Sequence, residues 1–235
     1  MGATRRTTDL PAIDASSICD AALVLAKESG IDGWSSRQLA KSIEAHPSII
    51  NYYVGRREDV VHLVIDRVNA EIDLPEYHGD WKPWFKALLE GLRSTLRGYP
   101  GVARRLAAVG PGLGESERII NRGIEVLSDA GFGDQAAFVY TILLSQTCAF
   151  VATEDDRNNM DDIRKEAGVT YAGALDNTEP GMAALAKAIK PLTEKERTRR
   201  DFFDRQFHVF IDALLDGMDS FLAACNNSGK NRAPH

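Results

Sequence analysis

Residues 34–60, WSSRQLAKSIEAHPSIINYYVGRREDV, limit the possible folds of this chain more than any other segment. Ser35 suits the N-cap of a short helix, and Pro47 suits the first turn of a second one, because its missing N–H needs no partner there. His46 or Ala45 would cap that second helix. Helices this short are stabilised by their neighbours rather than by intrinsic propensity. The segment therefore predicts a helix-turn-helix, a motif whose second helix enters the DNA major groove.

The second helix of this motif has an apolar inner face and a polar, aromatic outer surface. Ile50 and Val54 are four residues apart, so they share the face that packs inward. The other positions carry small, polar or aromatic side chains rather than charges: Ser48, Ile49, Asn51, Tyr52 and Tyr53. A helix that only builds a core would not carry these side chains outward. We therefore interpret it as a DNA-reading helix.

Three segments near the N-terminus follow the pattern of a known family. They are AALVLAKESGIDGW (21–34), SSRQLAKSI (35–43) and INYYVGRREDV (50–60). With these motifs the first 70 residues resemble the TetR family of bacterial transcriptional repressors, in which the third segment reads Leu-Tyr-x-x-Phe and then Gly-x-Lys-Glu-Glu-Leu. The chain departs from this pattern at three positions: Glu44 for Gly, Asn51 for Tyr and Val54 for Phe.

The resemblance implies a set of DNA contacts, which are Ser36, Arg37, Pro47, Ser48, Ile49, Asn51, Tyr52, Tyr53 and Arg57. Asn51 can bond adenine with both atoms of its amide, and Ile49 can contact a thymine methyl group. Tyr52 and Arg57 would bind phosphates, which position a protein without reading sequence. The resemblance further implies that a homodimer binds a palindromic operator on double-stranded DNA.

The distribution of charge supports docking to DNA by one face. The whole chain carries a net charge of −6, which argues against a general polyanion binder. Residues 1–57 contain seven basic and six acidic side chains, a net of +1, so the remainder carries −7. At the N-terminus, Arg5 and Arg6 either enter the minor groove as a flexible arm or belong to a solvated tail.

Composition and motifs limit the function classes further. The N-terminus lacks the apolar core of a signal peptide, and no apolar run reaches the ~20 residues that span a bilayer. The three widely spaced cysteines indicate reduced thiols, so we expect a cytoplasmic protein that does not bind membranes. The cluster Glu154, Asp155 and Asp156 has the chemistry to bind a divalent cation but reads as part of a solvated loop. Without HExxH, GxSxG or a dinucleotide fingerprint, we expect no enzyme, no metal site and no cofactor.

The chain beyond the helix-turn-helix is also helical, which predicts an all-α protein with two domains. The DNA-binding domain covers residues 1–73 and ends with a linking helix at 57–73. A larger ligand-binding and dimerisation domain covers 80–225, and a disordered tail covers 226–235. Two apolar helices of the larger domain, 134–153 and 193–225, are expected to pair with those of a second copy.

In the family that the chain resembles, the larger domain binds a small molecule. The candidate lining residues are Trp81, Trp84, Phe85, Leu88, Arg105, Leu113, Ile119, Phe138, Thr141, Gln146 and Phe150. Arg105 is the best single anchor for a ligand, because its surroundings are apolar and rich in glycine. The alternative for any one of these residues is a filled core. The effector itself stays unknown at this point.

The sequence thus favours a transcriptional repressor that a small molecule releases from DNA. Two other interpretations stay open. One is a helical scaffold or small-molecule-binding protein without sequence-specific DNA binding. The departures from the family pattern at Glu44, Asn51 and Val54 are consistent with this alternative. The other is an enzyme that acts on a small molecule in the helical body.

Overall fold

The computed structural model describes residues 13–112, 114–160, 165–166, 168–170 and 179–230, with side chains as far as Cys225. No strand occurs among these residues, which confirms the all-α prediction. The helices are α1 (Ala15–Ser29), α2 (Ser36–Ser42), α3 (Pro47–Tyr53), α4 (Arg57–Ala70), α5 (Trp81–Leu96), α6 (Val102–Val109), α7 (Ser116–Leu127), α8 (Ala136–Asn159), α10 (Pro180–Ile189) and α11 (Glu196–Lys230). Short turns of π or 3-10 helix lie at Ser128–Phe132, Gly133–Gln135 and Lys190–Thr193.

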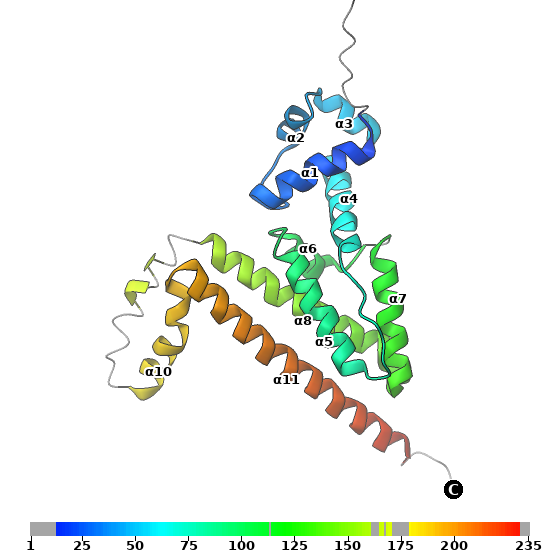
Figure 1. Ribbon diagram of the computed structural model, residues 1–235, viewed down its shortest axis with the longest axis vertical. Coiled ribbons are helices and arrows are strands. Elements are labelled where there is room, and N and C mark those ends of the chain that lie inside the picture. Colours follow the sequence, from blue (N-terminus) through cyan, green and yellow to red (C-terminus); the bar gives the residue numbers. More distant parts are fainter. Residues whose placement is uncertain (1–12, 113, 161–164, 167, 171–178, 231–235) are drawn as a thin grey trace, which may run out of the picture.

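Helices α1, α2 and α3 form a small head at one end of the molecule, and α4 leads from it into the body (Figure 1). The caps that define the motif are made as the sequence predicts. At α2 the Ser35 hydroxyl accepts from the backbone N–H of Gln38. At α3 the His46 ring accepts from the N–H of Ser48, and Pro47 occupies the first turn. The predicted helix-turn-helix is therefore present.

The turn between α2 and α3 contains an unusual backbone conformation. Glycines aside, Glu44 is the single described residue with a positive φ, 52°. A Cβ is unfavourable in this left-handed region, and glycine tolerates it best. The family pattern has glycine at this position for the same reason, and the chain keeps the geometry without the glycine.

Helix α4 connects the head to the body. Its buried face consists of Val60, Val61, Val64 and Val68. The helix ends at Ala70, three residues before the predicted end at 73, because the chain there turns toward α7. Arg118 of α7 donates to the carbonyls of Asn69, Ala70 and Ile72 at 2.6–3.1 Å. These bonds satisfy carbonyl groups that a helix end leaves open and attach α4 to the body.

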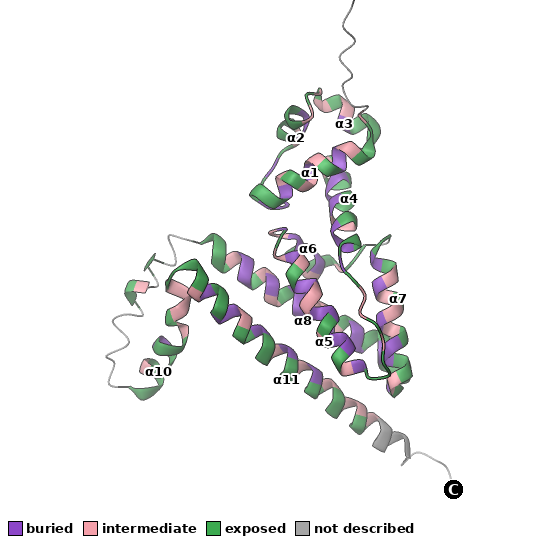
Figure 2. Ribbon diagram, in the orientation of Figure 1, coloured by how far each residue is buried: buried purple, intermediate pink, exposed green. Residues whose placement is uncertain are grey.

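Helix α8 lies at the centre of the body, where α5, α6, α7 and α11 all pack against it. Figure 2 shows the buried faces of these helices turned toward one another and the outer face of α11 exposed. The segment 116–159 is long and apolar enough, by length and composition alone, to cross a membrane. In this fold α8 instead has the position of a core helix.

The acidic cluster that follows the apolar part of α8 corrects one prediction. Glu154, Asp155 and Asp156 belong to the last turns of α8 rather than to a solvated loop, and Glu154 is 1% exposed. Glu154 accepts from Arg93 at 3.1 Å and pairs with Arg97 at 2.9 Å, both on α5. Buried carboxylates require such partners. The cluster therefore joins α5 to α8 and leaves no open cation site at Glu154.

The C-terminal helix differs from its predicted bounds. It starts at Glu196 rather than 193, and α8 starts at Ala136 rather than 134. Helix α11 continues to Lys230, so its backbone extends into the segment 226–235 that the sequence analysis assigns to the tail. Residues 231–235 and the N-terminal arm with Arg5 and Arg6 lie outside the described residues.

Candidate DNA interface and ligand cavity

The outer surface of α3 carries the side chains that the sequence assigns to DNA reading. Ile50 is 1% exposed and anchors the helix in the core of the head. On the other faces Ser48 and Asn51 are exposed, while Tyr52 is 81% and Tyr53 46% exposed, with their rings edge to face at 5.0 Å. Pro47 and Ile49 are half-buried at the rim. The outer surface of α3 thus presents one amide and two phenol groups that could contact a DNA groove.

The start of α2 supplies a second exposed group. Arg37 is exposed and Ser36 is half-buried in the first turn of this helix. Both lie in the first turn behind the Ser35 cap, where backbone N–H groups favour an anionic neighbour such as phosphate. Their exposure leaves both residues accessible to a binding partner, and their contact with DNA stays a prediction.

Arg57 is not placed as predicted. Its guanidinium donates to the carbonyls of Ile31 at 2.9 Å and Trp34 at 3.1 Å, and it stacks on the Trp34 ring at 4.7 Å. It also pairs with Asp32 and Glu58. A guanidinium with its donors committed in this way holds the loop before α2 and has little left for a phosphate. The neighbouring Arg56 is exposed at the N-cap of α4.

Arg105 also has a different role from the one predicted. Its guanidinium pairs with Asp32 at 2.5 Å and with Glu58 at 2.8 Å, two residues of the head. The hydrogen bonds from Arg105 lower the pKa of both carboxyl groups. Arg105 therefore bridges α6 of the body to the head.

Further contacts complete this head–body joint. The N–H of Ile31 donates to the carbonyl of Pro100 at 2.8 Å, across the two domains. Lys27 of α1 lies over the Tyr99 ring at 4.8 Å, and the Tyr99 hydroxyl donates to Glu71 at 2.5 Å. We use "head–body joint" below for the contacts of Ile31, Asp32 and Glu58 with Pro100 and Arg105.

A cavity of about 380 Å³ lies in the body between α4, α5, α6, α7 and α8. Its lining is mainly aliphatic and consists of Asn69, Ile72, Leu88, Leu92, Leu106, Ala107, Gly110, Pro111, Ser116, Ile119, Ile120, Ile124, Ala137, Tyr140, Thr141, Leu144, Ser145 and Cys148. Leu88, Ile119 and Thr141 are the predicted residues found there. The size falls within the range of small-molecule sites.

The remaining predicted pocket residues lie elsewhere. Trp81 and Phe85 pack in the core, and the Trp84 indole donates to the carbonyl of Pro75 at 2.8 Å. Phe138 is 58% exposed on α8. Gln146 and Phe150 face α11. The filled-core alternative is thus correct for the aromatic residues of α5, and Leu113 lies outside the described residues.

The sequence analysis missed Asn69 and Tyr140. Both line the cavity, Asn69 from α4 and Tyr140 from α8, and they are 4% and 7% exposed. A signal was present for Asn69, which lies four residues after Ile65 on the inner side of an otherwise apolar helix. Tyr140 had no such signal, because a phenol in an apolar helix is usually part of the core.

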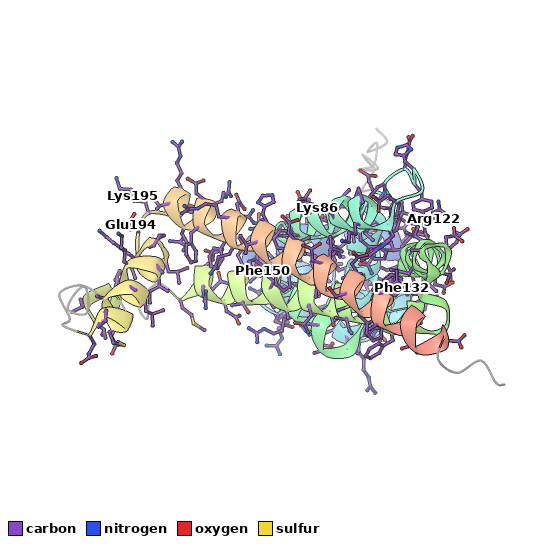
Figure 3. All side chains as sticks on the ribbon, turned by 90° about the horizontal axis from the view of Figure 1, so that it is seen from below. Lys86, Arg122, Phe132, Phe150, Glu194 and Lys195 are labelled. Carbon is purple, nitrogen blue, oxygen red and sulfur yellow. The ribbon has the colours of Figure 1, made fainter. Side chains whose placement is uncertain are left out.

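A separate open groove of about 780 Å³ runs along α8 and α11. The Phe150 ring, which Figure 3 places between these two long helices, stacks on Phe210 at 5.3 Å and meets Phe207 edge-on at 5.2 Å. Val209 on the same face is 71% exposed. This surface is the one that the sequence predicts for the dimer.

The model of a family described as "Tetracyclin repressor-like, C-terminal domain" matches residues 74–222. An HTH-type transcriptional regulator from Saccharopolyspora erythraea is 30% identical over 125 residues, and the chain spans about half of that relative's length (52%) and matches over 52% of its own.

Solved structures share the whole fold. Apo ActR from Streptomyces coelicolor superposes with a TM-score of 0.74 at 20% identity, over 91% of this chain and 98% of that one. ActR in complex with actinorhodin gives 0.72 at 20% identity, over 88% and 95%. TetR from Acinetobacter baumannii gives 0.63 at 19% identity, over 90% and 99%.

Proposed function

This chain belongs to the TetR family of transcriptional regulators, and from that premise we propose that it is a cytoplasmic repressor. In this proposal a homodimer binds a palindromic operator through α2 and α3 of each copy. A small molecule that enters the cavity of the body releases the protein from DNA. A structural relative, ActR, has been solved in complex with actinorhodin, which supports a ligand-responsive body.

The observation that carries the proposal is the course of α4. Near its start, Val60 and Val61 are buried in the hydrophobic core. At its end, Asn69 and the following Ile72 form part of the cavity wall. One rigid element therefore touches the DNA-binding head and the ligand cavity, so a ligand that moves its lower end also moves the head.

We assign DNA contacts from exposure and chemistry. Asn51, Tyr53 and Ser48 would read or approach base edges, with Ile49 and Pro47 at the rim of the groove. Tyr52, Arg37 and Ser36 would contact phosphates. Arg56 replaces Arg57 as the phosphate contact at α4, because Arg57 is committed to the loop of the head.

The dimer is proposed to form through α8 and α11. Their common face is apolar and exposed at Val209 and Phe138, and it continues into the aromatic groove around Phe150. Exposed apolar surface of this extent on a soluble chain is typical of an interface. Pairing across a two-fold axis would place two reading helices on successive turns of DNA, ~34–36 Å apart or a multiple of it.

The test is a selection of bound duplexes from a random-sequence library. We expect a palindrome, bound by a dimer. Asn51→Ala and Tyr53→Ala should each weaken binding to it by ~1–3 kcal/mol while the melting temperature stays unchanged, since both side chains are exposed. Asn121→Ala, an exposed position on α7, is the matched control. Recovery of no common sequence would favour the scaffold alternative.

A further inference from the structure

The cavity between α4, α5, α6, α7 and α8 differs from most polar binding sites in one respect. Its lining contains no acidic or basic side chain among the residues that the structure describes. A charged ligand transferred from water into such a site would lose its hydration without gaining a counter-charge, which costs several kcal/mol at least. The cavity therefore discriminates against ions and favours neutral molecules.

The polar groups of the lining fall into two classes. Three hydroxyls already donate to backbone carbonyls near them: Ser116 to Gly112, Thr141 to Ala137 at 2.9 Å, and Ser145 to Ile142 at 3.3 Å. These bonds lie within or next to the helix that carries each hydroxyl. Their donors are used before any ligand arrives.

Asn69 and Tyr140 form the second class. Within the described part of the chain, neither the Asn69 amide nor the Tyr140 hydroxyl has a hydrogen-bond partner, although both residues are more than nine-tenths buried. Burial raises the pKa of Tyr140, so its phenol stays protonated and can donate. Both groups line the cavity, so a ligand with a suitable oxygen can bond to them without displacing a protein partner.

Both groups are held in place by their surroundings. A Cβ at Gly123 of α7 would lie 2.6 Å from Cε2 of the Tyr140 ring, so the ring fits against α7 only because that residue is glycine. Arg118 donates to the backbone carbonyl of Asn69 at 3.0 Å and fixes the end of α4. The amide and the phenol thus enter the cavity from two helices in fixed positions.

A charged crevice adjoins the cavity and shares Asn69, Leu106, Gly110 and Pro111 with it. Its ionisable groups are His62, which is exposed, Asp66 and Arg105. Arg105 is held in the head–body joint, and Asp66 accepts from the N–H of Glu115 at 2.7 Å. The three ionisable groups of the crevice therefore lie outside the cavity lining and leave the cavity itself uncharged.

We propose that the effector is an uncharged, largely apolar compound with a carbonyl or hydroxyl oxygen that bonds to Asn69 and Tyr140 together. This inference rests on the proposed function, since it names the ligand class of the same cavity. It adds that an anionic or cationic form of the same skeleton is excluded. It also assigns the polar recognition to one residue on α4 and one on α8.

The experiment uses the full chain without DNA and the neutral naphthyl ketone prodan, a fluorescent probe whose emission shifts when its carbonyl accepts a hydrogen bond. The charged comparison is the corresponding dimethylamino-naphthoate, which has a carboxylate in place of the ketone. We expect saturable prodan binding with one probe per chain. The naphthoate should bind at least about a hundredfold more weakly, because its charge has no partner in the cavity.

Variants locate the contacts. Asn69→Leu and Tyr140→Phe should each weaken prodan binding by about three- to tenfold and shift its bound emission to the blue, as expected for one lost hydrogen bond. Ser128→Ala is the matched control and should leave both unchanged, because this exposed hydroxyl donates to the carbonyl of Ile124 and lies outside the cavity lining. Far-ultraviolet circular dichroism and melting confirm that each variant folds.

Three results would overturn the proposal: no prodan binding, naphthoate binding of equal strength, or unchanged emission in both variants. Failure of the proposed function is separate, because the operator selection uses no probe. A chain that selects a palindrome but fails the prodan test retains the function and loses this ligand class. A chain that binds prodan as expected but selects no DNA sequence retains this ligand class and loses the proposed function.

Discussion

Replacement of Arg105 by Met removes the charge from the head–body joint and keeps most of the aliphatic stem. We expect a loss of stability and a less firmly held head. In the protein as it stands, Arg105 pairs with Asp32 at 2.5 Å and with Glu58 at 2.8 Å. Because α4 still connects the two parts and the N–H of Ile31 still donates to the carbonyl of Pro100 at 2.8 Å, the head will not detach, but its orientation will be less restricted.

The magnitude follows from exposure. The Arg105 side chain is 27% exposed, and those of Asp32 and Glu58 are 58% and 56% exposed. Ion pairs that are exposed to this degree contribute ~0.2–1 kcal/mol each, so we expect Arg105→Met to lower the free energy of unfolding by ~1 kcal/mol. At ~1 M salt, where the Debye length is ~3 Å, most of this difference should disappear.

Urea denaturation at low and high salt measures both quantities. A double-mutant cycle with Glu58→Gln should give a coupling energy of ~0.5 kcal/mol. The control is Arg104→Met, which removes the neighbouring positive charge but breaks a pair with Asp156 inside the body. Zero coupling between Arg105 and Glu58 at low salt, with both single variants folded, would refute the bridge.

Three other changes test the assignments. Arg56→Ala should weaken binding to all DNA sequences alike and lower the dependence of log affinity on log salt concentration by about one unit in titrations. Arg57→Ala should instead lower the free energy of unfolding by ~2 kcal/mol. The reverse pattern would show that Arg57 rather than Arg56 contacts the phosphate. Burial raises the pKa of Asp155 to about 6 from 3.8, so the folded state binds the proton more tightly and stability falls as pH rises between these values. Asp155→Asn should flatten that fall and raise stability at neutral pH by ~1–3 kcal/mol, and an unchanged profile of unfolding free energy against pH would contradict the shift. Val209→Asp should yield folded monomers in sedimentation, while Val24→Asp, at an exposed valine of α1, should leave the dimer intact; a dimeric Val209→Asp protein would place the interface elsewhere.

The sequence predicts the head better than the body for a physical reason. Cap and first-turn residues such as Ser35 and Pro47 act on their immediate neighbours, so their consequences can be read locally. The reading helix is also specified locally, because its inner and outer faces differ within seven residues. Arg57 was misassigned because its partners Ile31 and Trp34 are more than 20 residues away along the chain.

Predictions for the body failed where distant residues determine the environment. The stretch from Glu154 onward is polar enough to suggest a loop, but Arg93 lies 61 residues earlier and provides the charge that allows Glu154 to be buried. Trp84 and Phe85 were expected in a pocket because aromatic residues line many pockets, yet they fill the core. Which apolar helix faces border the cavity depends on the packing of five helices, and no local pattern records that.

Any movement that a ligand induces has to reach the head through contacts that already exist. At its lower end α4 is attached to α7 through Arg118 and Asp66, and near its start Val60 and Val61 are buried in the core. The body holds the head at a second place, the head–body joint. Helix α4 and helix α6 contact the head at separate places. A shift of α4 alone therefore strains the head–body joint, and the head must rotate about that joint. The ion pairs of the joint are worth ~1 kcal/mol, which lies at the lower end of the ~1–3 kcal/mol typical of allosteric coupling. A ligand at Asn69 would therefore need a differential affinity of at least ~1 kcal/mol between the two conformations to overcome the joint.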